Sequence, residues 1–229
     1  MMNYRHFEIE LAELSRSLAG MGSLVERSLA IAVAAIQSPV VEAREQARVI
    51  ENQLDALETT IEDRCHKLIA LQAPMAKDLR LVIAAMRITA DVEQVGDLSE
   101  SVAKRASWIA RNHKVVNPPE LATLCEVSTR MVHEALTSFL TGSPNAARDV
   151  ISLEDEADRL TKRCFEGIQQ HMAEHPERIR EYTHLLRAVA HLESIADLAV
   201  SIAEEGVYIH QGQFIRHSHE RLSGDVPQT

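Results

Sequence analysis

Very few residues that break helices interrupt this chain. Its 229 residues include only 8 glycines and 7 prolines, whereas average usage would give about 27 of the two together. Six of the prolines mark five breaks, at Pro39, Pro74, residues 118–119, Pro144 and Pro176. Because proline holds the preceding residue in an extended conformation and fits the first turn of a helix, each break predicts a helix junction.

The segments between these breaks are long enough to be single helices. Aromatic residues make up only 3% of the chain, and a β-sandwich or barrel needs more aromatic and turn residues than this. We therefore expect an all-α fold of six long helices. They should cover residues 5–37, 41–72, 75–113, 119–141, 145–174 and 177–211.

The second half of the chain is a diverged copy of the first. The third and sixth expected helices align without a gap at an offset of 100, which places Leu98 on Leu198 and Ser101 on Ser201. The simplest architecture is two tandem three-helix bundles. The expected units are a first repeat, a second repeat and a disordered tail, at residues 1–116, 117–212 and 213–229.

Charge and composition exclude several classes of protein. A net charge of −10 opposes binding to nucleic acid, because such binding depends on neutralising phosphates. The longest uncharged stretch, residues 28–41, is shorter than the roughly 20 apolar residues of a membrane span. The N-terminus has no apolar segment typical of a secretory signal. The 3 cysteines form no CxxC motif and suggest reduced thiols of a cytoplasmic protein.

Four pairs of carboxylates occupy matched positions in the two repeats. The two members of each pair are four residues apart, so they lie on one face of a helix and repel each other. The pairs are Glu51/Asp55, Glu93/Asp97, Glu154/Asp158 and Glu193/Asp197.

At least three of these pairs are expected in or beside a buried helix face. On the third helix, Glu93 and Asp97 continue an apolar line. That line consists of Leu79, Ile83, Met86 and Ala90. On the second helix, the pair belongs to an acidic face, with Glu58 and Glu62, beside an apolar stripe. A buried carboxylate is costly unless it is paired or binds a metal, and oxygen ligands suit hard ions. We predict that the pairs hold multinuclear metal clusters.

With these motifs, the chain resembles the PhoU family of phosphate-uptake regulators over nearly its whole length. Residues 74–106 are similar to the family's central block, with its P-x-x-x-DLR start and its E-x-x-GD centre. Residues 188–205 are similar to the second copy of that block. The sequence departs from the family pattern at Gln94 and Ser194, where a basic residue is common, and at residues 196–198, where the family usually has GDH.

The resemblance implies a cytoplasmic regulator that is not an enzyme. Such a protein would act between a phosphate ABC transporter ATPase and a membrane histidine kinase, and would repress the phosphate-starvation response. Its membrane association would run through these partners only. The resemblance also implies iron or zinc clusters, held by the eight paired carboxylates, and a homodimer.

Two other interpretations stay open. A ferritin-like di-iron protein needs two Glu-x-x-His motifs, and Glu181 with His184 supplies one. A metal-free helical adaptor would use its acidic faces for solubility alone. The sequence has no glycine-rich phosphate loop, so it gives no support for direct binding of phosphate or nucleotides.

Overall fold

The chain folds into six long α-helices, as the spacing of the prolines predicts. The computed structural model describes residues 2–112 and 115–211, and the predicted tail, residues 213–229, lies outside this part of the chain. A single 3₁₀ turn, Pro176–Arg178, precedes the last helix. The helices are α1 (Met2–Gln37), α2 (Ala43–Gln72), α3 (Ala76–Arg111), α4 (Glu120–Thr141), α5 (Pro144–Glu174) and α6 (Ile179–Gln211).

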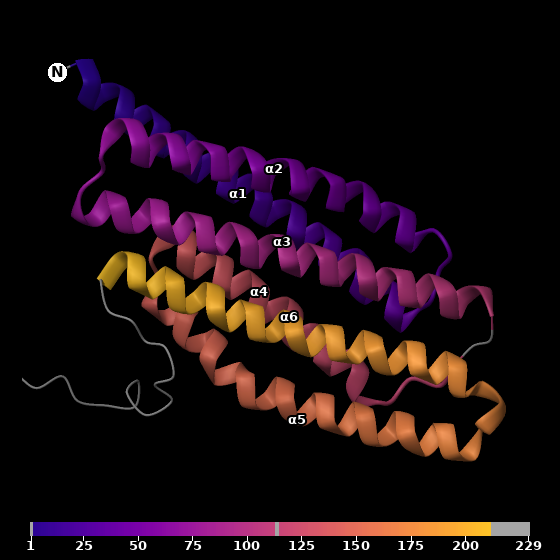
Figure 1. Cartoon of the computed structure of the whole chain (residues 1–229). Coiled ribbons are helices and arrows are strands. Elements are labelled where there is room, and N and C mark those ends of the chain that lie inside the picture. The colour runs from indigo at the N-terminus through magenta and orange to yellow at the C-terminus, as the bar shows by residue number, and fades with distance from the viewer. Residues whose placement is uncertain (1, 113–114, 212–229) are drawn as a thin grey trace, which may run out of the picture.

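The helices form two three-helix bundles that pack against each other along their length. Helices α1, α2 and α3 make the first bundle, and α4, α5 and α6 make the second (Figure 1). Helices α3 and α6 lie side by side in the middle, with α2 and α5 at the outer edges (Figure 1). One continuous hydrophobic core runs through both bundles. The middle helices therefore bury one side in their own bundle and another against the neighbouring bundle.

Local sequence chemistry explains where the helices stop. Helix α4 ends at Gly142, whose φ of 71° is in the left-handed region that favours glycine. The side chain of Ser143 then caps α5 by accepting a hydrogen bond from the amide of Ala146 at 3.3 Å. Pro144 occupies the first turn of α5, where no amide donor is needed.

Helix α1 is the one helix of the described residues that is long and apolar enough to cross a membrane by length and composition. The segment Phe7–Gln37 contains a window of mean hydropathy 1.4, and 44% of that window is buried. Leu14, Met21 and Leu29 are fully buried against the other helices. This packing is what a core helix of a bundle requires.

The three cysteines are free and buried. Burial raises the pKa of the Cys65 and Cys125 thiols to about 11 and that of Cys164 to about 12. A rise of two or more pKa units lowers the reactive thiolate fraction about a hundredfold. We expect iodoacetamide at pH 8 to label the folded protein at least about a hundredfold more slowly than the unfolded chain. A cysteine that reacts at the unfolded rate would show that its helix opens readily.

Candidate metal centre

Carboxylates from α2 and α3 meet along the line where these two helices pack against each other, which we call the first groove. Oxygen atoms of Glu51, Asp55 and Glu93 lie within 4.8 Å of one another. Asp97 also faces this set, because its charge contributes to raising the pKa of Glu51. The structure therefore brings both predicted pairs of the first repeat into one set.

Glu51 occupies the most enclosed position of the set. Both of its carboxylate oxygens are buried, and neither accepts a hydrogen bond from a described residue. Burial, and after it the neighbouring carboxyls of Asp97, Asp55 and Glu93, raise the pKa of Glu51 to about 8. The acidic face of α2, expected to lie beside the apolar stripe, thus turns one carboxylate inward.

Gly96 explains how α2 and α3 come close enough for this arrangement. A Cβ atom at this position would lie 2.3 Å from Cδ1 of Leu54 and 3.0 Å from Oε2 of Glu51. Leu54 is fully buried, so its side chain has little room to move away. In the second repeat, the corresponding residue is Ala196.

We therefore expect Gly96→Ala to destabilise the protein by about 1–3 kcal/mol, the usual effect of overpacking a tight contact. Gly20 is a matched control, since a Cβ atom there meets nothing within 4 Å. Gly20→Ala should instead stabilise α1 by about 0.5–1 kcal/mol. Urea unfolding measures both changes, and equal effects of the two substitutions would contradict the role assigned to Gly96.

Glu58 joins this set, although the sequence analysis did not assign it as a ligand. Burial and the charges of Glu62, Asp55 and Asp97 raise its pKa. The signal was present in the sequence, because Glu58 lies seven residues after Glu51 and so on the same helix face. At the offset of 103, Glu58 and Glu62 correspond to Thr161 and Phe165. The two repeats therefore offer unequal numbers of carboxylates.

A second set lies in the matching groove between α5 and α6. Burial raises the pKa of Glu193, followed by the charges of Asp197 and Asp158. Burial and the charge of Asp158 likewise raise the pKa of Asp197. Glu154, half-buried, lies one turn before Asp158. Within the described residues, only the first set brings three carboxylates within 4.8 Å of one another.

The prediction that the apolar line on α3 forms a buried face is wrong. Ile83 is 36% exposed and Ala90 is also exposed, so the line that leads to Glu93 and Asp97 is not a core face. The core of α3 includes Val82, Val92 and Val95 instead. The reason is that α3 packs against several neighbours, whereas the prediction assumed one buried stripe.

The paired carboxylates consequently lie at the rims of the grooves. In every pair the glutamate is half-buried and the aspartate is exposed. Oxygen ligands at a rim can bind an ion and leave it open to solvent or to a partner.

The donor chemistry of the first set fits a hard metal ion. In the described part of the chain, no lysine or arginine forms an ion pair with Glu51, Asp55, Glu93 or Asp97. Arg87, the nearest arginine before Glu93 on α3, pairs with Glu205 at 2.9 Å instead. Glu51 and Glu93 are half-buried, have raised pKa values and lack a cationic partner, so a bound cation would stabilise them.

Comparisons with known proteins match this arrangement of two repeats. The family model for the PhoU domain matches residues 18–106 and again residues 121–206. The chain belongs to the PhoU family. Each matched segment contains two of the four carboxylate pairs.

The PhoU relatives resemble the chain over nearly its full length. The phosphate-specific transport system accessory protein PhoU homolog of Aquifex aeolicus is 30% identical over 216 residues, which are 94% of this chain and 98% of the relative. The homolog of Rhizobium meliloti is 32% identical over 97% of this chain and 94% of the relative. The crystal structure of PhoU from Pseudomonas aeruginosa matches with a TM-score of 0.86 and 30% identity, covering 90% of this chain and all of the other. The fold and the family prediction are thus confirmed.

The Glu-x-x-His motif of this PhoU chain lies in a different chemical environment. The ring of His184 stacks on Trp108, with 3.9 Å between the ring centroids. The charges that act on His184 come mainly from Arg105, Arg180 and Arg187. A ferritin-like site requires the histidine to join carboxylates around a metal, so the arginines argue against that interpretation.

Proposed function

We propose that this protein is a regulator of phosphate uptake that acts as an accessory protein of a phosphate ABC transporter. The observation that carries the proposal is the full-length match to proteins named as phosphate-specific transport system accessory proteins. In this proposal the protein contacts the transporter ATPase and a membrane histidine kinase, and it represses the phosphate-starvation response when phosphate is plentiful. It works as a cytoplasmic homodimer without catalysing a reaction, and reaches the membrane only through these partners.

We further propose that the two grooves hold multinuclear metal clusters. Glu51, Asp55, Glu93 and Asp97 would hold the first cluster, and Glu58 would add a carboxylate that the second lacks. The second would rest on Glu154, Asp158, Glu193 and Asp197. Iron or zinc are the proposed metals; a set made only of oxygen donors fits oxidised iron better, because structural zinc prefers Cys and His.

A bound metal would neutralise charges that otherwise repel across each groove. In the first groove, it would join α2 to α3 through ligands on both helices, and in the second it would join α5 to α6. The chain's own contribution is to hold the carboxylates in place through helix packing. The metal would thereby stabilise the rims of both grooves as surfaces for a partner.

A capture experiment in phosphate-replete cells tests the regulatory role. The tagged full chain should co-purify with an ABC transporter ATPase and a histidine kinase, identified by mass spectrometry. Deleting the gene should switch on the phosphate-starvation genes in rich phosphate, and the intact gene should restore repression. Normal repression in the deletion strain would contradict the proposal.

The metal-free helical adaptor remains the alternative, and it predicts the same partners. The metal-binding regulator needs the paired carboxylates for repression, whereas the metal-free adaptor does not. If a variant that combines Glu93→Gln and Asp97→Asn with Glu193→Gln and Asp197→Asn restores repression as fully as the natural chain, the adaptor interpretation is correct and the clusters have no regulatory role.

A further inference from the structure

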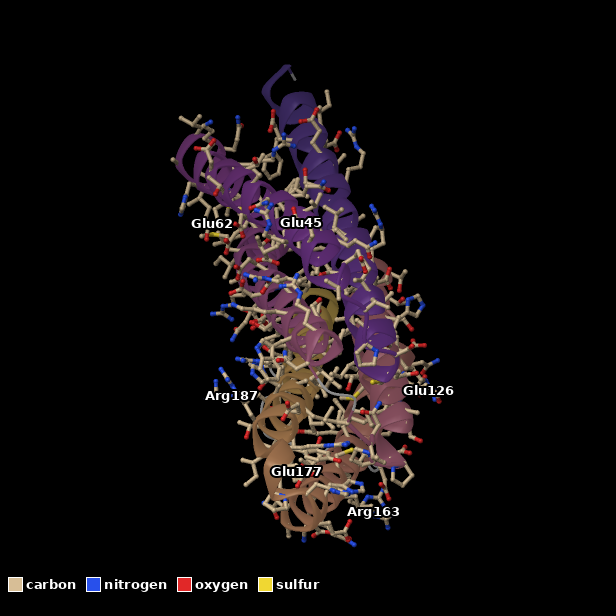
Figure 2. The ribbon with its side chains drawn as sticks, turned by 90° about the vertical axis from the view of Figure 1, so that its right-hand side faces the viewer. Glu45, Glu62, Glu126, Arg163, Glu177 and Arg187 are labelled. Carbon is tan, nitrogen blue, oxygen red and sulfur yellow. The ribbon has the colours of Figure 1, made fainter. Side chains whose placement is uncertain are left out.

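A basic pocket lies at the end of the molecule where α2 begins, α3 ends and α6 begins. Its volume is about 110 Å³. Figure 2 faces this end of the molecule, where Glu45 marks the start of α2 and Arg187 marks α6. The pocket is lined by Arg44, Lys104, Arg105, Ser107, Trp108, Arg111 and His184. It contains none of the carboxylates assigned to the metal centres.

Positive charge exceeds negative charge around this pocket, although the chain as a whole has a net charge of −10. Its lining contains three arginines and one lysine. Arg180 adds a further cation, 5.3 Å from the centre of the Trp108 ring. The nearby acids are Glu45, Glu100 and Glu181. Glu45 pairs with Arg48, Glu100 is 3.6 Å from Nε of Arg44, and Glu181 is buried. Three carboxylates, one of them paired with an arginine outside the pocket, cannot balance this number of cations.

Arg105 is a partly buried cation of the pocket that forms no ion pair with a described residue. Its Nε atom is buried without a hydrogen-bond partner among the described residues. Its Nη1 atom lies 3.4 Å from Nδ1 of His184, which is not an anion. Burial and the charge of Arg187 lower the pKa of Arg105, and the opposing effect of Glu100 is smaller. An anion in the pocket would supply the missing acceptor and the missing charge.

The walls of the pocket are fixed by contacts that do not use up its cations. The Ser107 hydroxyl accepts a hydrogen bond from the Arg44 amide at 3.0 Å and donates one to the Val40 carbonyl at 3.1 Å. This arrangement holds the start of α2 against the end of α3. On the opposite side, the stack of His184 on Trp108 holds α6 against α3. The ends of the three helices that carry the cations are thus held together before any ligand binds.

We propose that this pocket binds the phosphoryl group of a small ligand. Arginine forks match the oxygens of a phosphoryl group with paired, charge-assisted hydrogen bonds. The excess of cations suits a group that carries about two negative charges better than one carboxylate. The size of the pocket fits one compact group. No glycine-rich loop is involved, because side chains from three helices replace its backbone amides.

A ligand in this pocket would connect the two bundles. Arg44 and Arg105 belong to the first bundle, whereas His184 belongs to the second. The proposed site does not depend on the regulatory role or on the metal clusters, so it can succeed or fail independently of both.

The single tryptophan of the chain gives a direct test, because Trp108 forms part of the pocket wall. The full chain would be titrated with inorganic phosphate, pyrophosphate and ATP at constant ionic strength, with chloride as the reference. Calorimetry follows all three ligands, and tryptophan fluorescence follows the first two. We expect saturable binding of at least one of them. The tightest ligand tells whether the phosphoryl group belongs to free phosphate, to a diphosphate or to a nucleotide.

Substitutions decide whether binding occurs in this pocket. Arg105→Gln should weaken binding about tenfold or more, because it removes charge-assisted hydrogen bonds. Arg163→Gln, an exposed arginine on α5 labelled in Figure 2, is the matched control and should bind as the natural chain does. If Arg105→Gln unfolds, as circular dichroism would show, Lys104→Gln at an exposed position takes its place. Absence of saturable binding, or equal affinities for the pocket and control variants, would overturn the proposal.

Discussion

Replacing Glu93 by Gln and Asp97 by Asn should remove the metal from the first groove and leave the second groove loaded. Both side chains keep their size but lose the negative charge that binds the ion, and Glu93 belongs to the set whose oxygens lie within 4.8 Å of one another. Metal affinity at this groove should fall at least about a hundredfold. Metal analysis of the purified variants measures the loss, and circular dichroism should show unchanged helix content.

The matching change in the second repeat provides the comparison. Glu193→Gln with Asp197→Asn should remove the metal of the second groove and spare the first. Glu166→Gln is the control for charge alone, since Glu166 is an exposed glutamate of α5 outside both sets. Metal content equal to that of the natural chain in both double variants would show that the sites are misplaced.

Glu51→Gln should change stability and metal binding in opposite directions. With a pKa of about 8, well above its ordinary value of 4.5, Glu51 keeps a proton in the folded metal-free protein at pH 7, whereas the unfolded chain releases it. Its contribution to stability is therefore fully present below about pH 4.5 and is lost as the pH rises through 8. Glutamine removes this penalty at pH 8. We expect the variant's metal-free form to melt higher there, by about 2–4 °C for each kcal/mol gained.

The same substitution should reduce the rise in melting temperature that metal causes in the natural chain, leaving the part that comes from the second groove. Metal displaces the proton of Glu51, so metal affinity of the natural chain should increase between pH 6 and pH 8. Thermal unfolding with and without added metal at several pH values measures both effects. A metal-free variant that is less stable than the natural chain at pH 8 would mean that Glu51 has an ordinary structural role.

Much of the fold was predictable because proline and glycine act locally. Gly142 and Pro144 fix the junction of α4 and α5, because each of these residue types favours the backbone conformation found at its position, whatever its neighbours are. The acidic pairs were visible for the same reason, since a spacing of four residues places side chains on one face of any helix. Their matched positions in the two repeats distinguish these pairs from ordinary surface acids.

The burial of individual side chains was not predictable to the same degree. Ile83 is exposed although it lies on an apolar line, because contacts with neighbouring helices determine which faces of α3 are buried. The inward turn of Glu51 depends on the close approach that Gly96 permits, and the sequence of α2 contains no sign of it. The basic pocket likewise gathers Arg44, Arg105 and His184 from three helices. The spacing of residues along any one helix cannot reveal a pocket that is assembled from three helices.

The metal content of the natural protein shows whether the paired carboxylates hold metal. The full chain would be purified without added metal or chelator and measured by mass spectrometry for iron, zinc, manganese and nickel. We expect more than one metal ion per chain, because two grooves each present several carboxylates. We also expect the melting temperature to rise when metal is added back to the stripped protein. A metal-free protein whose melting temperature does not respond to any of these ions would contradict the proposed clusters.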